Sequence, residues 1–286
     1  MKTPARLRPL VEDCLIDEVL SQLMSGKEAD VYIVRSGSKI RAAKVYKEAA
    51  KRSFKKAVTY QEGRKVRNSR RARAMEKGSK FGRQQQEETW QNAEVDALQR
   101  VDRAGVRVPN TYGCVEGVLL MELITGADGN VAPRLSEVSM DPEQAIEDHN
   151  VMMQYVTRML CAGVIHGDLS EFNVLVDEYG PVVIDMPQAV NAAANNNAEP
   201  MLKRDVNNMR DYYGQFAPEL LSTRYADEIW ALYVDGDLTP ETELTGEFED
   251  PTDSADVDSV LTEIQAALAE EEERLSRIKE ADETGG

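Results

Sequence analysis

The feature that most constrains this chain is the run VIHGDLSEFNVLVDEYGPVVIDMP at residues 164–187. Asp168 and Asn173 lie five residues apart in a polar stretch, and Asp185 ends an apolar strand. The residues between them have the pattern of a β-hairpin that turns at 177–180. Such a hairpin would direct all three side chains into one cleft. This spacing is typical of a phosphoryl-transfer site, in which one Asp orients the attacking hydroxyl or water while an Asn and a second Asp hold Mg²⁺ against nucleotide phosphates.

A lysine stands inside the apolar strand AAKVY at residues 42–46. With the side-chain period of two, Lys44 shares a face with Ala42 and Tyr46, where an unpaired ammonium would be costly. Fifty residues later a helical stripe carries a single charge, that of Glu94; its members are Trp90, Glu94, Ala97, Leu98 and Val101. We therefore expect a Lys44–Glu94 ion pair that directs Lys44 to the α- and β-phosphates. The alternative is an exposed strand lysine.

A short glycine-bearing loop, MSGKEAD at residues 24–30, precedes a strand hairpin over residues 31–46. Backbone N–H groups in a loop of this kind can approach phosphate oxygens. Because the loop is not GxGxxG, it is a weak signal by itself.

Taken together, HGDLSEFN, IDMPQAV, GKEADVY and AAKVYK resemble the motifs of the RIO family of atypical serine/threonine protein kinases, and the GKEA loop resembles its first subfamily. The resemblance covers about residues 10–235. It implies an α+β, two-lobed, protein-kinase-like fold whose small lobe has an antiparallel sheet with helices and whose large lobe is reduced and helical. The expected parts are residues 1–124, with an N-terminal helix and the small lobe; 125–235, the large catalytic lobe; and 236–286, an acidic linker and tail helix.

The resemblance also implies ATP and Mg²⁺ as cofactors, with Mn²⁺ as an expected substitute. Asp168 and Lys44 would be catalytic, and Asn173 and Asp185 would bind the metal. The residues expected to bind the nucleotide are Ser25, Gly26, Lys27, Glu28, Ala29, Lys44, Glu94, Met121, Glu122 and Ile124. In this set Met121 lies at the back of the adenine pocket, and Glu122 and Ile124 offer backbone groups to the base.

Further elements are expected from apolar periodicity and helix-start signals. Helices are predicted at about 10–23, 141–161, 203–216, 223–233 and 256–278, and two short strands are predicted to meet near 116–117. Asp141 is a candidate N-cap, with Pro142 at the first helical position. His149 and His166 are better interpreted as structural residues than as a ligand or a base.

The net charge of −17 conceals a strong asymmetry. Residues 51–83 contain 13 Lys or Arg and two Glu, whereas residues 240–286 contain 16 Asp or Glu and three basic residues. The basic segment is a candidate contact for RNA or a ribosomal particle, with salt-sensitive, phosphate-driven binding. A solvated charge run is the alternative.

The chain departs from ordinary protein kinases after Asp185. The interval up to Pro200 has no Ser, Thr or Tyr, and Met186 and Pro187 replace the usual Phe and Gly. Phosphorylation within this interval therefore cannot switch it. The next helix begins too soon for a peptide-substrate platform. We expect transfer to protein Ser/Thr or to the enzyme itself; an ATPase switch or scaffold on RNA or ribosomal particles is the alternative. A small-molecule kinase of the aminoglycoside or choline type is disfavoured by PQA and GKEADVY.

Three cysteines without CxxC spacing suggest neither a disulfide framework nor a zinc site. The amino terminus lacks a signal-peptide core, and no apolar run approaches the roughly 18 residues that a membrane helix needs. We therefore expect a cytoplasmic protein with no membrane partner and an unidentified protein substrate.

Overall fold

A computed structural model of the chain describes residues 3–47, 93–186 and 189–249. The backbone divides into two compact units, Met1–Glu247 and Phe248–Gly286, and the fold described below is that of the first unit. The basic segment 51–83, Trp90 and the acidic helix expected at 256–278 lie outside the described residues.

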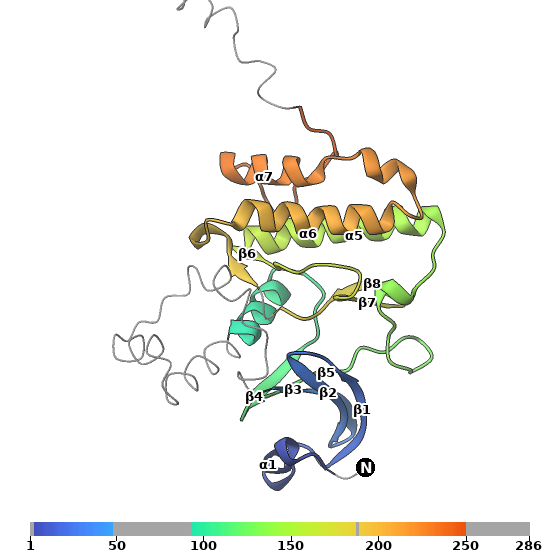
Figure 1. The fold of residues 1–286 in the computed structure, drawn as a ribbon, viewed down its shortest axis with the longest axis vertical. Coiled ribbons are helices and arrows are strands. Elements are labelled where there is room, and N and C mark those ends of the chain that lie inside the picture. Colours follow the sequence, from blue (N-terminus) through green and yellow to red (C-terminus); the bar gives the residue numbers. More distant parts are fainter. Residues whose placement is uncertain (1–2, 48–92, 187–188, 250–286) are drawn as a thin grey trace, which may run out of the picture. The chain divides into compact units, whose positions relative to one another are not determined.

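The small lobe is built on a five-stranded antiparallel sheet with the order β1-β2-β3-β5-β4 (Figure 1). Its strands are β1 (Glu18–Ser25), β2 (Ala29–Ser36), β3 (Lys39–Tyr46), β4 (Thr111–Val115) and β5 (Val118–Glu122). The chain enters the sheet through η1 (Ala5–Leu7) and α1 (Arg8–Glu12). The predicted β2–β3 hairpin is confirmed, as are the two strands that meet at residues 116–117.

The two faces of β3 pack against different parts of the lobe, because side chains alternate along a strand. Ala43 and Val45 join the apolar core that also contains α1. On the opposite face Tyr46 joins the core that contains the helix over residues 93–103, drawn in teal in Figure 1. Lys44, which shares the face of Tyr46, is therefore directed toward that helix.

The prediction of a helix over residues 10–23 is wrong. Helix α1 ends at Glu12, and the following residues turn the chain into β1, which pairs along its length with β2. Leu15 and Leu23, expected on the apolar side of a helix, are each 40% exposed. Pairing with β2 provides backbone hydrogen bonds, and this tertiary contact outweighs the helical spacing of the apolar residues.

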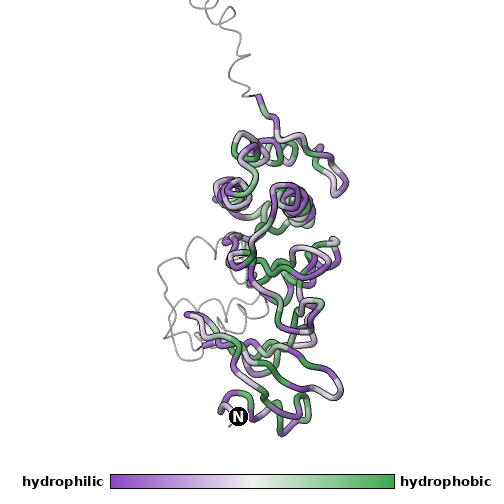
Figure 2. Tube along the Cα trace, turned by 90° about the vertical axis from the view of Figure 1, so that its right-hand side faces the viewer, coloured by the Kyte–Doolittle hydropathy of each residue, from purple (hydrophilic) through white to green (hydrophobic). Residues whose placement is uncertain are grey.

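The described part of the large lobe contains three α-helices, which pack against one another (Figure 1). They are α5 (Pro142–Cys161), α6 (Ala198–Tyr213) and α7 (Tyr225–Asp235). A short 3₁₀ helix precedes each of them in the chain: η4 (Leu135–Glu137), η5 (Ala192–Ala194) and η6 (Pro218–Ser222). In Figure 2 hydrophilic and hydrophobic residues alternate along these helices, as expected for helices that bury one face. The predicted N-cap of α5 is confirmed, because the Asp141 carboxylate accepts a hydrogen bond from the Gln144 amide.

Two short antiparallel pairs complete the large lobe. Strands β7 (Val174–Asp177) and β8 (Gly180–Val183) form the predicted hairpin, and β6 (Val164–Ile165) pairs with β9 (Val190–Asn191). Helices α6 and α7 match the two predicted helices, but α6 begins five residues earlier than expected. The shortness of the connection after Asp185 is therefore confirmed.

The residues after α7 pack back onto that helix. The Glu228 carboxylate accepts hydrogen bonds from the backbone amides of Thr245 and Gly246, each at 2.8 Å, and the Arg224 amide donates to the Gly246 carbonyl. This arrangement holds the chain against α7 as far as the end of the first unit. Among the described residues, no helix has the length and apolar character needed to cross a membrane.

Candidate active site

Lys44 and Glu94 form the ion pair that the sequence predicts. The Lys44 Nζ atom lies 2.6 Å from Glu94 Oε1, and the two side chains are 9% and 1% exposed. The other carboxylate oxygen of Glu94 accepts a hydrogen bond of 2.5 Å from the Tyr46 hydroxyl. Burial and the charge of Glu94 raise the pKa of Tyr46, which keeps this hydroxyl a neutral donor. Both oxygens of a buried carboxylate are thus satisfied, as burial of a charge requires.

The same ammonium reaches the end of the β7–β8 hairpin. Lys44 Nζ lies 2.5 Å from Asp185 Oδ1. Burial lowers the pKa of Lys44, but the charges of Glu94 and Asp185 together raise it above the ordinary value. Partial desolvation by the surrounding protein would by itself raise the pKa of Asp185, but the Lys44 ammonium outweighs this effect and holds the pKa below its usual range. Both groups are therefore charged at neutral pH, and Lys44 joins the small lobe to the predicted metal site.

The backbone holds Asp185 in an uncommon conformation. Its φ angle is 65°, in the left-handed region that residues other than glycine rarely adopt. The side chain is 44% exposed even though it contacts Lys44. The carboxylate is thus accessible to a ligand.

His166 connects the loop that carries Asp168 to the strand that leads to Asp185. Its Nε2 atom lies 3.0 Å from the Ile184 carbonyl oxygen, and its Nδ1 atom accepts a hydrogen bond of 3.2 Å from the Asp168 amide. Because Nδ1 is the acceptor, the proton of the neutral ring belongs on Nε2. Both ring nitrogens are occupied by backbone groups, which agrees with the structural role expected for this histidine. His149 is also buried, and it packs against the rings of Tyr213 and Tyr225.

Residues of helix α6 hold the Asp168 loop in place through hydrogen bonds to its backbone. The Asp205 carboxylate accepts hydrogen bonds from the backbone amides of Gly167 (2.7 Å) and Leu169 (3.2 Å). Asn208 donates to the Leu169 carbonyl and Arg204 donates to the Gly167 carbonyl. Burial raises the pKa of Asp205 to about 6, although the two amides and the nearby cations oppose the shift. A charged group inside the lobe thus determines where the Asp168 loop lies.

Asn173 contributes to the loop through its amide nitrogen, which donates to the Asp168 carbonyl at 2.8 Å. This bond orients the side chain and leaves the amide oxygen as the group that could contact a cation. A carboxylate oxygen of Asp185 and the amide oxygen of Asn173 are suitable ligands for Mg²⁺. Among the described residues, no group of three or more His, Cys, Asp or Glu gathers as a metal site. The two oxygen donors therefore fit a cation whose coordination is completed by phosphates and water.

The loop between β1 and β2 is held by the lysine that follows β3. Lys47 Nζ donates to the Gly26 carbonyl (2.6 Å) and to Ser25 Oγ (3.2 Å), and it lies 3.1 Å from the Asp30 carboxylate. The Lys47 amide also donates to the Glu28 carbonyl. Ser25 and Lys27 are exposed, whereas Ala29 is buried. The loop is thus anchored at both of its ends while its tip faces solvent.

The three residues expected at the adenine end lie where β5 leaves the sheet. Met121 pairs with Ala42 of β3 and is half-buried. Ile124 is buried, and its carbonyl accepts a hydrogen bond from the Ala132 amide. The Glu122 carboxylate accepts two hydrogen bonds from Asn110, which fix the orientation of this side chain.

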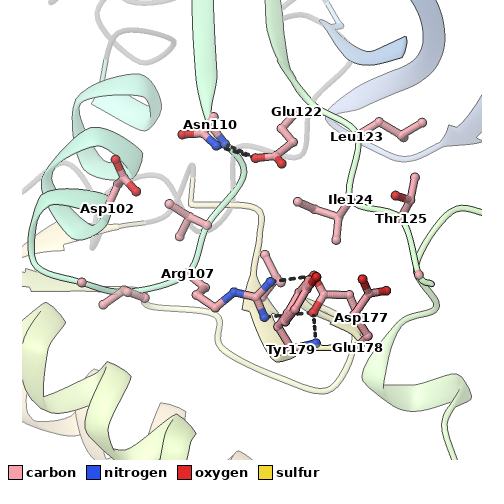
Figure 3. Close-up of a pocket in the computed structure, with 15 residues that line it drawn as sticks. Asp102, Arg107, Asn110, Glu122, Leu123, Ile124, Thr125, Asp177, Glu178 and Tyr179 are labelled. Carbon is pink, nitrogen blue, oxygen red and sulfur yellow. Dashed lines mark hydrogen bonds and ion pairs between the residues drawn. The ribbon is translucent and has the colours of Figure 1, made fainter. Parts of the chain in front are cut away.

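A cavity of about 510 Å³ adjoins this segment (Figure 3). It lies between residues 105–110, 122–126 and 177–179, and Figure 3 shows Arg107 projecting toward Asp177 at one side. The Arg107 guanidinium donates to both carboxylate oxygens of Asp177, at 2.9 and 2.6 Å. Glu122 and Ile124, which are expected to bind the nucleotide, line this cavity, whereas the predicted catalytic and metal-binding residues do not.

The comparison with known proteins decides the family. The model of the RIO domain matches residues 30–226, which is more than half of the chain. The chain belongs to the RIO family. A RIO-type serine/threonine-protein kinase Rio1 from Haloferax volcanii is 36% identical over 213 residues, covering 74% of this chain and 68% of the relative. The corresponding Rio1 of Methanocaldococcus jannaschii is 30% identical and covers 69% of this chain and 63% of the relative.

The human serine/threonine-protein kinase RIO1 is 29% identical over 229 residues. The match covers 79% of this chain but 38% of the human protein, so the RIO chain described here spans well under half of that relative. These similarities confirm the predicted first RIO subfamily, the α+β two-lobed kinase-like fold and the class of atypical serine/threonine protein kinase.

Two members of this RIO site were not singled out from the sequence. Tyr46 was placed on the face of Lys44, but its bond to Glu94 was not foreseen. Asp205 was missed, although a signal was available: it interrupts the buried stripe of α6 between Leu202 and Val206. A carboxylate at such a position needs donors from a neighbouring element.

Proposed function

We propose that this chain is an ATP- and Mg²⁺-dependent atypical serine/threonine kinase that transfers the γ-phosphoryl group to a protein hydroxyl or to itself. The observation that carries the proposal is the position of the Lys44 ammonium, which lies between a fully buried Glu94 and a solvent-accessible Asp185. A lysine fixed in this way presents a positive charge at the cleft without losing its proton.

Each predicted residue has a role in this reaction. Asp168 would orient the attacking hydroxyl and accept its proton as the bond from that oxygen to the γ-phosphorus forms and the bond to ADP breaks. Lys44 would neutralise charge on the α- and β-phosphates. Asn173 and Asp185 would hold Mg²⁺, or Mn²⁺ in its place, which neutralises phosphate charge when bound.

The remaining predicted residues would bind the nucleotide itself. The loop residues Ser25, Gly26, Lys27, Glu28 and Ala29 would cover the phosphates, and Glu94 would position Lys44. The adenine would lie against Met121 and contact backbone groups of Glu122 and Ile124. The exposed loop tip and the half-buried end of β5 support this assignment.

The acceptor is proposed from what surrounds the site. The early start of α6 at Ala198 leaves little chain after Asp185 to form a peptide platform, which favours self-phosphorylation or a protein substrate that binds through a larger surface. RNA or a ribosomal particle is the proposed partner of residues 51–83. We propose the cytoplasm as the place of action, which agrees with three cysteines that are all unpaired.

The fate of the γ-phosphate of ATP tests the proposal. Purified full-length protein is incubated with γ-labelled ATP and Mg²⁺, with and without an added protein acceptor, and both free phosphate and protein-bound label are followed. We expect slow, Mg²⁺-dependent labelling of serine or threonine that survives acid. Asp168→Ala should reduce the rate roughly 100-fold or more, because the orienting group is lost.

Two results would contradict the kinase. Label that is cleaved by hydroxylamine would be an acyl phosphate, for which Asp185 is the candidate carboxylate, and it would favour the ATPase switch. Wild-type rates of labelling and phosphate release in Asp168→Ala would remove the catalytic role of this residue. The variant Asp211→Ala, which removes an exposed carboxylate on α6, is the matched control and should retain activity.

A further inference from the structure

Arg134 has a backbone that is fixed at the large-lobe side of the cleft. It forms an antiparallel bridge with Leu175 of β7, and the neighbouring Pro133 carbonyl accepts a hydrogen bond of 2.9 Å from the Val176 amide. The Arg134 amide donates to the Glu137 carboxylate at 3.1 Å. The residue is thus attached to the hairpin that separates Asn173 from Asp185, and its Cα position is set by the same strands.

The side chain of Arg134 extends from there to the small lobe. Its terminal nitrogen Nη2 lies 3.2 Å from the sulfur of Met24, the residue of β1 that directly precedes Ser25 and Gly26. Met24 is 39% exposed, so this contact lies at the surface of the cleft. The guanidinium therefore stands beside the entrance to the loop that is proposed to cover the phosphates.

The partner of this guanidinium is a weak one. A thioether sulfur is a poor hydrogen-bond acceptor, whereas a guanidinium offers five N–H donors. Within the described part of the chain, no carboxylate lies at ion-pair distance from Arg134. Other half-buried arginines do have such a partner: Arg107 pairs with Asp177, and Arg224 pairs with Asp227. A half-buried cation with this environment is suited to an anionic ligand.

The fold brings the backbone of Arg134 near the reacting groups. Arg134 is bridged to Leu175, two residues after Asn173, and the β7–β8 hairpin that contains Leu175 ends at Val183, two residues before Asp185. Lys44 itself is already engaged by two carboxylates, Glu94 and Asp185. A bound polyphosphate would bring several negative charges into a cleft in which two carboxylates already neutralise most of the Lys44 charge. Arg134 supplies a further positive charge, with which no carboxylate of the described residues forms an ion pair.

We propose that Arg134 is a nucleotide-binding residue whose guanidinium donates hydrogen bonds to polyphosphate oxygens of ATP from the large-lobe side of the cleft. The proposal rests on the proposed function, because it requires ATP in the Lys44 cleft. It adds a residue that none of the RIO motifs contains. Arg134 and Lys44 would then hold the polyphosphate from opposite lobes, and Arg134 would exchange its contact with Met24 for the ligand.

Binding measurements with three ligands test this role. Calorimetric titrations of the full-length protein with adenosine, ADP and ATP, each with Mg²⁺, are compared among wild type, Arg134→Met and Arg134→Lys. Charge-assisted hydrogen bonds to phosphate predict that Arg134→Met weakens ATP binding roughly tenfold or more while adenosine affinity is unchanged. Arg134→Lys keeps the charge but loses the planar donor set, so its ATP affinity should be intermediate.

Lys39→Met is the matched control, because it removes an exposed cation at the start of β3 and should leave all three affinities unchanged. Equal ATP affinity in wild type and Arg134→Met would overturn the role of Arg134 while the proposed function stands. An equal loss for adenosine and ATP would also overturn it, since the effect would then be on the shape of the cleft. Failure of the wild type to bind ATP would instead overturn the proposed function, and this inference with it.

Discussion

Lys44 is a charged residue in a strand that is otherwise apolar, and its two acidic neighbours explain why it is tolerated there. Glu94 is entirely buried and compensates the ammonium, while Asp185 is partly exposed and can exchange Lys44 for another cation. The pair with Glu94 is thus a structural contact that persists, and the pair with Asp185 is one that a metal ion could replace. A single lysine joins the structural and the chemical parts of the site.

We predict that Lys44→Ala and Glu94→Ala are strongly non-additive. Breaking a buried pair leaves an uncompensated charge, and such changes cost roughly 3–5 kcal/mol. Each single variant should therefore lower kcat/KM roughly 100-fold or more, and the double variant should be about as impaired as either single one. The measurement is the rate of self-phosphorylation at subsaturating ATP for all three variants.

A melting curve of each variant distinguishes loss of the fold from loss of the site. Arg35→Ala with Glu18→Ala is a suitable control cycle, because that pair is about half-exposed on the surface and should add within experimental error. Effects of Lys44→Ala and Glu94→Ala that multiply in the same way would show that the two residues act independently.

The amino-acid sequence was sufficient to predict the pairs that depend on a regular period. Lys44 and Glu94 could be matched because a strand face and a helix stripe each contained one charge of opposite sign. The bond between Asp205 and the Asp168 loop could not be matched in this way, because the acceptor is a carboxylate and the donors are backbone amides, which every residue has. The contact of Arg134 with Met24 was equally inaccessible, since it joins residues 110 apart without a shared period.

At the scale of elements, the best predictions concerned segments with strong end signals. The start of α5 was marked by Asp141 and Pro142, and the β7–β8 hairpin was marked by its turn. The prediction of a helix over residues 10–23 was wrong because the apolar residues there fit a helical stripe as well as a strand. The strand β1 forms because this segment pairs with β2. The spacing of apolar residues reports on a single element, whereas an edge strand such as β1 forms only by pairing with the neighbouring strand.

Helix α6 controls the Asp168 loop through one carboxylate, and this gives the site a pH dependence. The pKa of Asp205 is about 6, above its ordinary value of 3.8, so its protonation on acidification weakens the bonds from the Gly167 and Leu169 amides. We predict that kcat falls as the pH is lowered through about 6. Asp205→Asn should lower kcat roughly 10- to 100-fold at pH 7.5, because the loop is less well positioned, and should flatten the acidic limb of the pH profile.

The contribution of Asp205 to stability has the opposite sign. Because the folded-state pKa is raised, this group adds stability that is complete below about pH 4 and is lost as the pH rises through about 6. Asp205→Asn should therefore melt at pH 7.5 no more than slightly below the wild type. A variant that unfolds at this pH, or one that keeps the wild-type pH profile, would contradict the positioning role. Asp211→Asn on the same helix is the control.

On the scale of the whole molecule, the distribution of charge matters more than its sum. The net charge is −17, yet residues 51–83 are strongly basic and residues 240–286 strongly acidic. The basic segment of such a chain can be attracted either to the acidic segment or to an external polyanion, so that the two compete for it.

We predict that the full-length protein binds RNA with a log affinity that falls steeply with log salt. Replacing Arg70, Arg71 and Arg73 by Ala should reduce the slope by about one per cation that contacts phosphate. The matched control replaces three exposed cations elsewhere, Arg8, Lys39 and Arg103. A chain that ends at Glu249 should be measured beside the full chain, since the acidic tail could mask the segment. Absence of binding by both at low salt would leave residues 51–83 as a solvated charge run.

The contacts between Glu228 and the Thr245–Gly246 segment determine where this domain can be cut. A chain that ends just after α7 would leave the Glu228 carboxylate without its two backbone donors and would uncover the Tyr225 ring, against which Gly246 packs so closely that a Cβ atom there would lie 2.9 Å from the ring. Added to the left-handed φ of Gly246, this closeness makes the position intolerant of any larger residue. The carboxyl-terminal limit of the cooperative folding unit is thus a short strap and not the last helix, and an intact kinase domain must carry that strap with it.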